Sequence, residues 1–248
     1  MMEQTVLQGV KVTKRFGGIV ALSEVDFDLA QESIVGLIGP NGSGKTTLFN
    51  VISGIFRPDR GSILYEGRDI TRLEPDEISS LGIARTFQIV RPLKDLTVVD
   101  NVAVGVLYGR GIRGMKEARK EALELLGFTG LAGKKETRAG LLKLADRKRL
   151  EVTRALAIGP KLLLLDEVFA GLNQREIDDA IQLIFRIRKE MKMTIFMIEH
   201  VMKAIMQTCD RIIALDFGTK VADGAPADVA RVPEVIVAYL GAEYAENP

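Results

Sequence analysis

Two short runs, 161–165 and 194–198, mark the C-terminal half of the chain, and each has four consecutive apolar residues after its first position. Strands of this composition are buried on both faces, as in a parallel sheet covered by helices. Between the two runs, residues 175–189 carry isoleucines at helical spacing: Ile177, Ile181, Ile184 and Ile187. This spacing predicts a crossover helix that joins two parallel strands.

Elsewhere, apolar and polar residues partly alternate, which is typical of strands with one buried face. Residues 5–12 and 21–29 predict antiparallel strands near the N-terminus, and residues 62–67 predict a further short strand that ends at a glycine. Residues 211–223 predict a β-hairpin. These segments indicate an antiparallel region in addition to the parallel sheet.

Helical periodicity replaces the strand patterns from about residue 90 to residue 155. Residues 115–126 predict an amphipathic helix, with Gly127 as its stop. A final amphipathic helix is expected over about 227–240, interrupted by Pro233. We interpret the 90–155 segment as a helical insertion into an α/β domain. The apolar positions of the 115–126 helix are Ala118, Ala122, Leu125 and Leu126.

Composition narrows the functional classes. The 248 residues contain 34 Lys and Arg against 33 Asp and Glu, so the net charge of +1 gives no sign of broad binding to nucleic acid. The single cysteine, Cys209, excludes an internal disulfide. The first residues show no secretory signal, and no apolar run approaches the ~18–20 residues that span a bilayer. Any role at a membrane is therefore expected to depend on a partner.

Residues 39–46 read Gly-Pro-Asn-Gly-Ser-Gly-Lys-Thr, which is the pattern G-x-x-x-x-G-K-[ST] between an apolar run and a helix-like run. Glycines let backbone N–H groups turn inward around phosphates, and the dipole of the next helix favours the same anion. The alternative is a glycine turn that binds nothing, but every fixed position matches. We assign contacts with the phosphates of a nucleotide to Gly39, Asn41, Gly42, Ser43, Gly44, Lys45, Thr46 and Thr47.

Acidic residues follow the first apolar run. A strand end holds a carboxylate rigidly, as a Mg²⁺ ion beside a nucleotide requires, so we assign Asp166 to the metal together with the Thr46 hydroxyl. Glu167 would polarise the attacking water as a general base. A pair of acids in an ordinary turn is the alternative, which the apolar strand and the upstream phosphate loop disfavour.

Three further residues are candidates for the same site. His200, the only histidine, follows the second apolar run, and an imidazole there could hold the γ-phosphate and the attacking water. Gln88 could touch the metal or the water while reporting nucleotide state to the inserted helices. Phe16 could stack on adenine. The alternatives are a structural histidine, an exposed loop glutamine and a core phenylalanine.

These motifs, in this order and over nearly the whole chain, resemble the nucleotide-binding subunits of ABC transporters. The chain looks like one branch of this family, the ATP-binding subunits of branched-chain amino acid importers, in segments 12–18, 84–88, 170–173, 198–200 and 234–241. The matching motifs are the A-loop aromatic (Phe16), Walker A (39–46), the Q-loop (Gln88), Walker B (162–166), the catalytic glutamate (Glu167), the D-loop (170–173) and the switch histidine (His200).

The resemblance implies an α/β fold: a P-loop NTPase, RecA-like ABC ATPase core with an antiparallel β subdomain, at about 1–88 and 156–248, and an inserted helical subdomain at about 89–155. It implies an ATPase that binds ATP and Mg²⁺ at the cytoplasmic face of the inner membrane. Two such subunits would enclose ATP head to tail. Integral membrane permease subunits, and indirectly a substrate-binding protein, would complete the importer.

One motif departs from the family pattern Leu-Ser-Gly-Gly-Gln. The matching positions read Leu142-Lys143-Leu144-Ala145-Asp146. Lys143 removes a hydroxyl but offers a cation to the γ-phosphate of the opposite subunit. Asp146 is unfavourable near phosphate unless it caps the helix or pairs with Arg147 or Arg149. We therefore expect an asymmetric heterodimer with one altered site, and a homodimer is the alternative.

Other functions fit the sequence less well. The same motor could serve another cargo, such as an amide or a lipopolysaccharide. A soluble ABC ATPase in DNA repair would need a longer insertion than 90–155, and a translation factor would carry two cassettes. A binding switch without hydrolysis would need neither Glu167 nor His200.

Overall fold

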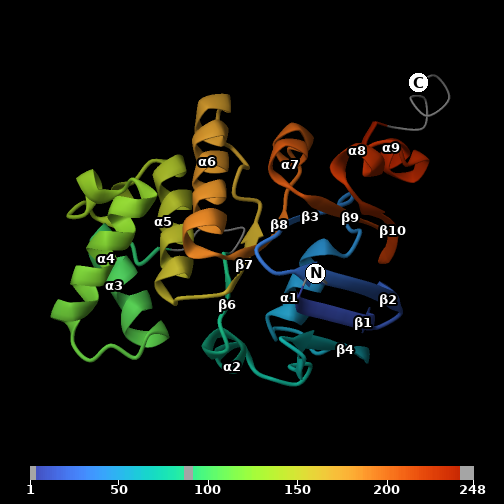
Figure 1. Ribbon diagram of the computed structural model, residues 1–248, viewed down its shortest axis with the longest axis horizontal. Coiled ribbons are helices and arrows are strands. Elements are labelled where there is room, and N and C mark those ends of the chain that lie inside the picture. Colours follow the sequence, from blue (N-terminus) through green and yellow to red (C-terminus); the bar gives the residue numbers. More distant parts are fainter. Residues whose placement is uncertain (1–3, 87–91, 241–248) are drawn as a thin grey trace.

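The computed structural model describes residues 4–86 and 92–240. Its central sheet has the strand order β10-β9-β3-β8-β7-β6 (Figure 1). The inner strands β3 (Ile34–Ile38), β7 (Leu162–Asp166) and β8 (Thr194–Ile198) are parallel to their neighbours, and β6 (Ile83–Arg85) and β9 (Arg211–Asp216) flank them in the same direction. Only β10 (Thr219–Gly224) pairs antiparallel, as the outer strand of the predicted hairpin.

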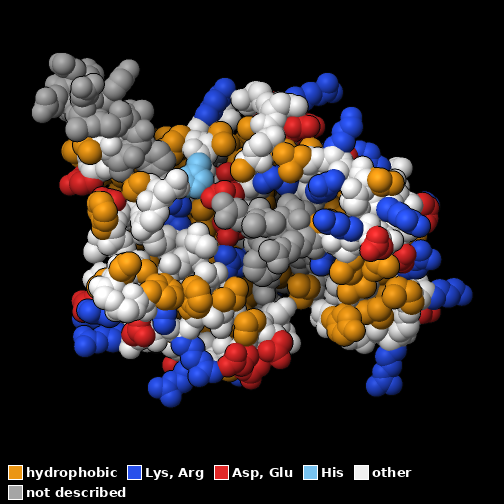
Figure 2. All heavy atoms as spheres, turned by 180° about the vertical axis from the view of Figure 1, so that it is seen from behind, with side chains coloured by type: hydrophobic (Ala, Val, Ile, Leu, Met, Phe, Trp, Pro, Cys, Tyr) orange, Lys and Arg blue, Asp and Glu red, His pale blue; other side chains and the backbone are white. Residues whose placement is uncertain are grey.

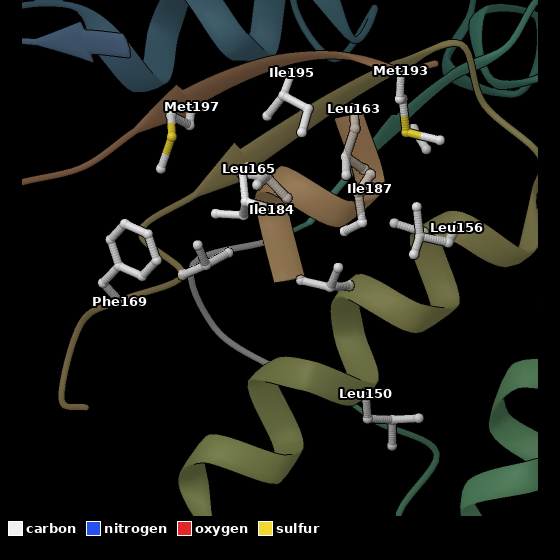
Figure 3. Packing of buried hydrophobic residues seen from close by; sticks show 14 of the residues in the cluster. Leu150, Leu156, Leu163, Leu165, Phe169, Ile184, Ile187, Met193, Ile195 and Met197 are labelled. Carbon is white, nitrogen blue, oxygen red and sulfur yellow. The ribbon is translucent and has the colours of Figure 1, made fainter. Parts of the chain in front are cut away.

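Every residue of β3, β7 and β8 is buried, as the continuous apolar runs predict. Alternate side chains enter two different cores. Leu163, Leu165 and Ile195 pack with the helices on one face (Figure 3), whereas Leu164 and Phe196 pack on the opposite face. The sheet is therefore the middle layer of the domain.

A second, antiparallel sheet covers that opposite face. It has the order β2-β1-β4-β5, formed by Thr5–Phe16 (β1), Ile19–Ala30 (β2), Arg60–Tyr65 (β4) and Arg68–Asp69 (β5). Helix α1 (Lys45–Ile52) contributes Leu48, Phe49 and Ile52 to the core that both sheets share. The predicted N-terminal strands are confirmed, and they extend further than the alternation indicates.

Helices cover the first face of the central sheet. The predicted crossover helix is α6 (Gln174–Met191), whose four spaced isoleucines are all buried. Helices α3 (Val98–Gly109), α4 (Met115–Thr129) and α5 (Leu144–Ala157) pack against one another on the side away from the antiparallel sheet (Figure 1). The remaining helices are α2 (Pro75–Ser80), α7 (Met202–Thr208), α8 (Pro226–Val229) and α9 (Pro233–Leu240).

Two predicted helix boundaries differ from the structure. Helix α4 does not stop at Gly127, because the buried Leu126 and Thr129 continue its apolar face; Gly130, at φ 78°, ends the helix instead. There the Leu131 N–H donates to the Leu126 carbonyl, as at many helix ends. The final helix is two helices, and Pro233 begins the second one. Within residues 4–86 and 92–240, none of the helices has the length and apolar character needed to traverse a bilayer.

Candidate functional site

The site lies at one edge of the central sheet, where the parallel strands β3, β8 and β7 end side by side. The loop 39–46 follows β3, Glu199 and His200 follow β8, and Asp166 and Glu167 end β7. Open α/β sheets bind their ligands at this edge. The adjacent strand β6 leads to residues 87–91, so the predicted metal residue Gln88 lies outside the residues that the structure describes.

The loop 39–46 is shaped by close backbone packing. A Cβ on Gly39 would lie 2.2 Å from the Leu215 carbonyl oxygen, and a Cβ on Gly44 would lie 2.5 Å from the Ala21 carbonyl oxygen. Both glycines also have positive φ, at 150° and 102°. Strands β9 and β2 thus press the loop into a form that side chains would prevent. Helix α1 begins within the loop, at Lys45. Its N-cap Gly44 makes no side-chain hydrogen bond, so the first N–H groups of the helix remain available for an anion.

Lys45 is buried within this loop. Its Nζ donates hydrogen bonds to the carbonyl oxygens of Gly39, at 2.7 Å, and Pro40, at 2.8 Å. Burial lowers the pKa of Lys45, and the negative charges of Glu167 and Asp166 oppose that shift. The loop and the strand-end acids are therefore close enough to interact. In the first turn of α1, Thr46 is exposed and Thr47 is partly exposed. In the loop before it, Asn41 and Gly42 are exposed, whereas Ser43 is buried.

The two carboxylate oxygens of Asp166 differ in their hydrogen bonding. Its Oδ2 accepts a hydrogen bond from Arg85 at 2.8 Å, whereas Oδ1 is buried without a hydrogen-bond partner among the described residues. Arg85 also donates to Asn50 at 2.7 Å and to Ser53 at 3.1 Å, which fixes it against helix α1. Burial raises the pKa of Asp166, and Arg85 opposes the shift. The sequence analysis gave Arg85 no role, because the pairing spans 81 positions.

The Oδ1 atom of Asp166, which has no hydrogen-bond partner among the described residues, and the hydroxyl of the exposed Thr46 are oxygen donors of the kind that Mg²⁺ prefers. In residues 4–86 and 92–240 no group of three or more His, Cys, Asp or Glu side chains could hold a metal ion alone. Magnesium in nucleotide sites takes one or two carboxylates and completes its shell with phosphates and water. The donor set is therefore suited to a metal that arrives with a triphosphate.

Glu167 and His200 lie together, as predicted. The Nε2 atom of His200 is 2.9 Å from Oε1 of Glu167, and both side chains are partly exposed to solvent. In Figure 2 the pale blue histidine lies beside red carboxylates on the surface. Glu167 adopts a left-handed conformation, φ 51°, which is uncommon for a residue other than glycine and is found at strained functional positions.

A buried network supports these two residues, and the sequence analysis did not identify it. Glu199 is 1 % exposed and accepts a hydrogen bond from the Phe169 N–H at 2.8 Å. Burial raises the pKa of Glu199 to about 7, although the hydrogen bond from Phe169 and the nearby Lys148 favour its charged form. Lys148, from helix α5, donates to the Glu167 carbonyl at 2.6 Å. In the sequence, Glu199 is marked only by its position, as an acidic residue directly after the buried strand β8.

Phe16 ends β1 and is 42 % exposed, with its ring 5.1 Å from the ring of Phe56 in an edge-on contact. It pairs with Ile19 across the hairpin, and the same strand β2 then reaches Gly44 of the phosphate loop through Ala21. Phe16 is thus an exposed aromatic ring on the hairpin that packs against the loop, rather than a core residue.

Lys143 is the N-cap of helix α5, and its exposed side chain makes no hydrogen bond or ion pair with the described residues. Asp146 neither pairs with Arg147 or Arg149 nor caps the helix, so neither of the two arrangements that would favour it near a phosphate is present among the described residues. It forms an ion pair instead with Lys134, which lies in the turn that follows α4. The pair neutralises the carboxylate near the start of α5.

Known proteins are similar to this chain in both sequence and fold. The model of the ABC transporter family matches residues 22–170. The chain is 36% identical, over 97% of its length and 99% of the relative, to the high-affinity branched-chain amino acid transport ATP-binding protein BraF of Pseudomonas aeruginosa. Its fold matches the ADP conformation of MJ1267, an ATP-binding cassette of an ABC transporter, with a TM-score of 0.87 and 30% identity over 96% and 99% of the two chains.

A further structural match is the dimeric ABC transporter cassette MJ0796, with a TM-score of 0.80 and 26% identity over 89% of this chain and 98% of that one. The family match, the phosphate loop and the strand-end acids agree with one another. The chain belongs to the ABC transporter family and is its ATP-binding, ATP-hydrolysing cassette.

Proposed function

We propose that this cassette powers the import of branched-chain or related amino acids through partner membrane subunits. The contact between Glu167 and His200, at the sheet edge that also carries the phosphate loop, supports the hydrolytic part of the proposal. The similarity to BraF along nearly both whole chains supports the cargo. The cassette would act at the cytoplasmic face of the inner membrane, held there by its partners.

The phosphates of ATP would lie in the loop 39–46. Backbone N–H groups of the loop and of the first turn of α1 would donate to them, with side-chain contacts from Ser43, Thr46 and Thr47. Lys45 would exchange its bonds to the carbonyls of Gly39 and Pro40 for the β- and γ-phosphates. Phe16 would stack on the adenine ring.

Asp166, Thr46 and Gln88 would hold the magnesium ion. Bound there, magnesium would withdraw negative charge from the β- and γ-phosphates as the bond between them breaks. Because Arg85 occupies Oδ2 of Asp166, the carboxylate would face the site through Oδ1 alone.

Glu167 would take a proton from a water molecule lying in line with the γ-phosphorus, while His200 would hold the γ-phosphate and the Glu167 carboxylate in register. The water oxygen forms a bond to phosphorus as the bond from the γ-phosphorus to the bridging oxygen breaks. ADP leaves with that oxygen, and inorganic phosphate carries the water oxygen.

A second ABC ATPase subunit would complete the site by bringing its own equivalent of loop 142–146 to the γ-phosphate. We favour a heterodimer, since Lys143 and Asp146 alter the loop that this chain would offer in return; Lys143 would contact the partner's ATP.

We divide the chain into a core at about 1–88 and 156–248 and a helical subdomain at about 89–155. A cleft between them, lined by Ser79, Arg85 and the exposed Tyr108, would receive a permease subunit.

The test is ATP turnover in the transporter assembled with its permease subunits and its substrate-binding protein. Glu167→Gln should still bind ATP but lose at least about 100-fold in turnover, because the general base is removed. Turnover of the unaltered transporter should rise when the binding protein carries leucine or a related amino acid. Stimulation by an amide or by lipopolysaccharide alone would contradict the cargo, and unchanged turnover in Glu167→Gln would contradict the catalytic role.

A further inference from the structure

Helix α5 reaches the catalytic loop through one buried side chain. Lys148 is 8 % exposed, and its Nζ lies 2.6 Å from the carbonyl oxygen of Glu167. A buried ammonium group is costly unless it is paired and hydrogen-bonded. Here the ammonium group donates its hydrogen bond to the backbone carbonyl of Glu167, the residue that we propose as the general base.

The backbone that Lys148 holds is in an uncommon conformation. Glu167, at φ 51°, persists in this conformation only if its surroundings determine it. Its N–H donates to the Ile198 carbonyl at 2.9 Å, and its own carbonyl accepts from Ala170 at 3.3 Å as well as from Lys148. Among these contacts, the one from Lys148 comes from a helix, α5, and not from the strand ends or their loop. A left-handed residue directs its side chain differently from an extended one, so this conformation sets the direction of the carboxylate.

Two further contacts make helix α5 and the loop after β7 a single unit. Leu144, in the first turn of α5, packs against Gly171, where a Cβ would lie 2.9 Å from the leucine Cδ2. Leu144 and Lys148 are one helical turn apart and therefore share a face. On the other side of the loop, the carboxylate of Glu199 accepts a hydrogen bond from the Phe169 N–H and, together with the buried Glu151 of α5, supplies negative charge near Lys148.

We propose that Lys148 is a positioning residue for hydrolysis, which fixes the Glu167 carbonyl so that the carboxylate is aimed at His200 and at the attacking water. The inference rests on the proposed function, since it requires Glu167 to be the general base. It also links the loop 142–146, which begins α5, to the hydrolytic acid of the same chain. Lys148 touches neither the phosphate loop nor the metal residue Asp166 directly.

The experiment compares Lys148→Met, Lys148→Arg and Glu167→Gln in the assembled transporter. Methionine keeps the apolar stem but removes the donor, whereas arginine keeps a buried cation with N–H groups. We expect Lys148→Met to lower kcat about 10-fold or more, with KM for ATP and the Kd of a fluorescent ATP analogue within about twofold, because a misplaced group loses rate and not binding. Lys148→Arg should recover kcat to within about threefold of the unaltered protein.

Lys161→Met is the matched control, since it removes an exposed lysine that pairs with Glu66 at the opposite end of β7. If Lys148→Met fails to fold because Glu199 loses its countercharge, Lys148→Met with Glu199→Gln removes both charges and keeps an oxygen for Phe169. That double variant should show the same loss of kcat.

If Lys148→Met, or Lys148→Met with Glu199→Gln, keeps kcat within twofold of the unaltered protein while Glu167→Gln is inactive, the proposal is overturned and the proposed function stands. A raised KM with unchanged kcat would overturn it as well. Turnover that survives Glu167→Gln would instead refute the proposed function.

Discussion

Two loops of this protein lead into the N-terminus of a helix, and they are built in opposite ways. The loop 39–46 is closed by its own chain: Lys45 bonds its carbonyls, and Gly39 packs against β9. The loop 142–146 is open. Its Lys143 side chain has no partner among the described residues, its Leu144 is 47% exposed, and Leu141, directly before the loop, is 77% exposed.

The difference shows which half of an ATP site one chain can build. The first loop is a preformed cradle whose N–H groups need only an anion. The second offers a cation and exposed leucines to the exterior, and exposed apolar side chains grouped near a polar rim are typical of an interface with another protein. These exposed side chains fit the contact with a second cassette that we propose above.

The largest effect is expected at the closed loop. Lys45→Ala should weaken ATP binding about 100-fold, because a buried cation facing phosphate is lost. Equilibrium binding of a fluorescent ATP analogue to the single cassette measures this, with Lys161→Ala as the control for loss of a lysine. Equal affinity in Lys45→Ala and the unaltered protein would mean that the loop does not bind phosphate.

The next effect concerns Glu199, the buried acid near Lys148 of helix α5, and the pH dependence of stability that it causes. Burial raises the pKa of Glu199 from 4.5 to about 7, so the folded protein keeps a proton that the unfolded chain releases near pH 4.5. The stability that this proton provides is complete below pH 4.5 and is lost as the pH rises through 7. Glutamine has no proton to lose. The unfolding free energy of Glu199→Gln, relative to the unaltered protein, should therefore rise by about 2 kcal/mol from pH 5 to pH 8.

Urea unfolding at a series of pH values measures that difference, and Glu176→Gln, at the exposed start of α6, is a suitable control. A difference that stays constant from pH 5 to pH 8 would show that Glu199 is not buried as a titrating acid.

A smaller effect is expected from restoring the family pattern in the open loop. Lys143→Ser, Ala145→Gly and Asp146→Gln together should raise ATP turnover or ATP affinity of the assembled transporter about three- to fivefold, since a hydroxyl and less crowded N–H groups would face the partner's γ-phosphate. Steady-state kinetics over a range of ATP concentrations separate the two. If neither rate nor affinity changes, the asymmetry between the two loops has no functional meaning.

The smallest effect concerns the pair between Lys134 and Asp146. Lys134→Ala should lower turnover about twofold at low salt, because Asp146 is then unbalanced near the phosphate, and the deficit should shrink as salt screens the charge. Lys161→Ala, which breaks an exposed pair with Glu66, is the matched control. An identical response of both variants to salt would argue against a local role for Lys134.

The same contrast explains what the sequence could predict. The loop 39–46 is contiguous, so its residues and their flanking strand and helix define it without knowledge of the fold. The strand-end acids could also be placed, because buried parallel strands end at one edge of a sheet. His200 and Glu167 meet there for that reason.

The supporting residues could not be placed in this way. Arg85, Lys148 and Glu199 act on partners 81, 19 and 30 positions away, and such pairings depend on how helices and strands pack. Lys148 has the pattern of an ordinary lysine on an amphipathic helix. The end of α4 shows the same limit, because burial of Thr129 decides between two possible glycine stops.

The most direct test of the ATP site is a structure of the Glu167→Gln variant with ATP and magnesium. We expect the triphosphate within loop 39–46, Lys45 turned from the carbonyls of Gly39 and Pro40 to the phosphates, and the side chains at positions 167 and 200 beside the γ-phosphate. A nucleotide bound elsewhere, or side chains at 167 and 200 directed away from the γ-phosphate, would contradict the site described here.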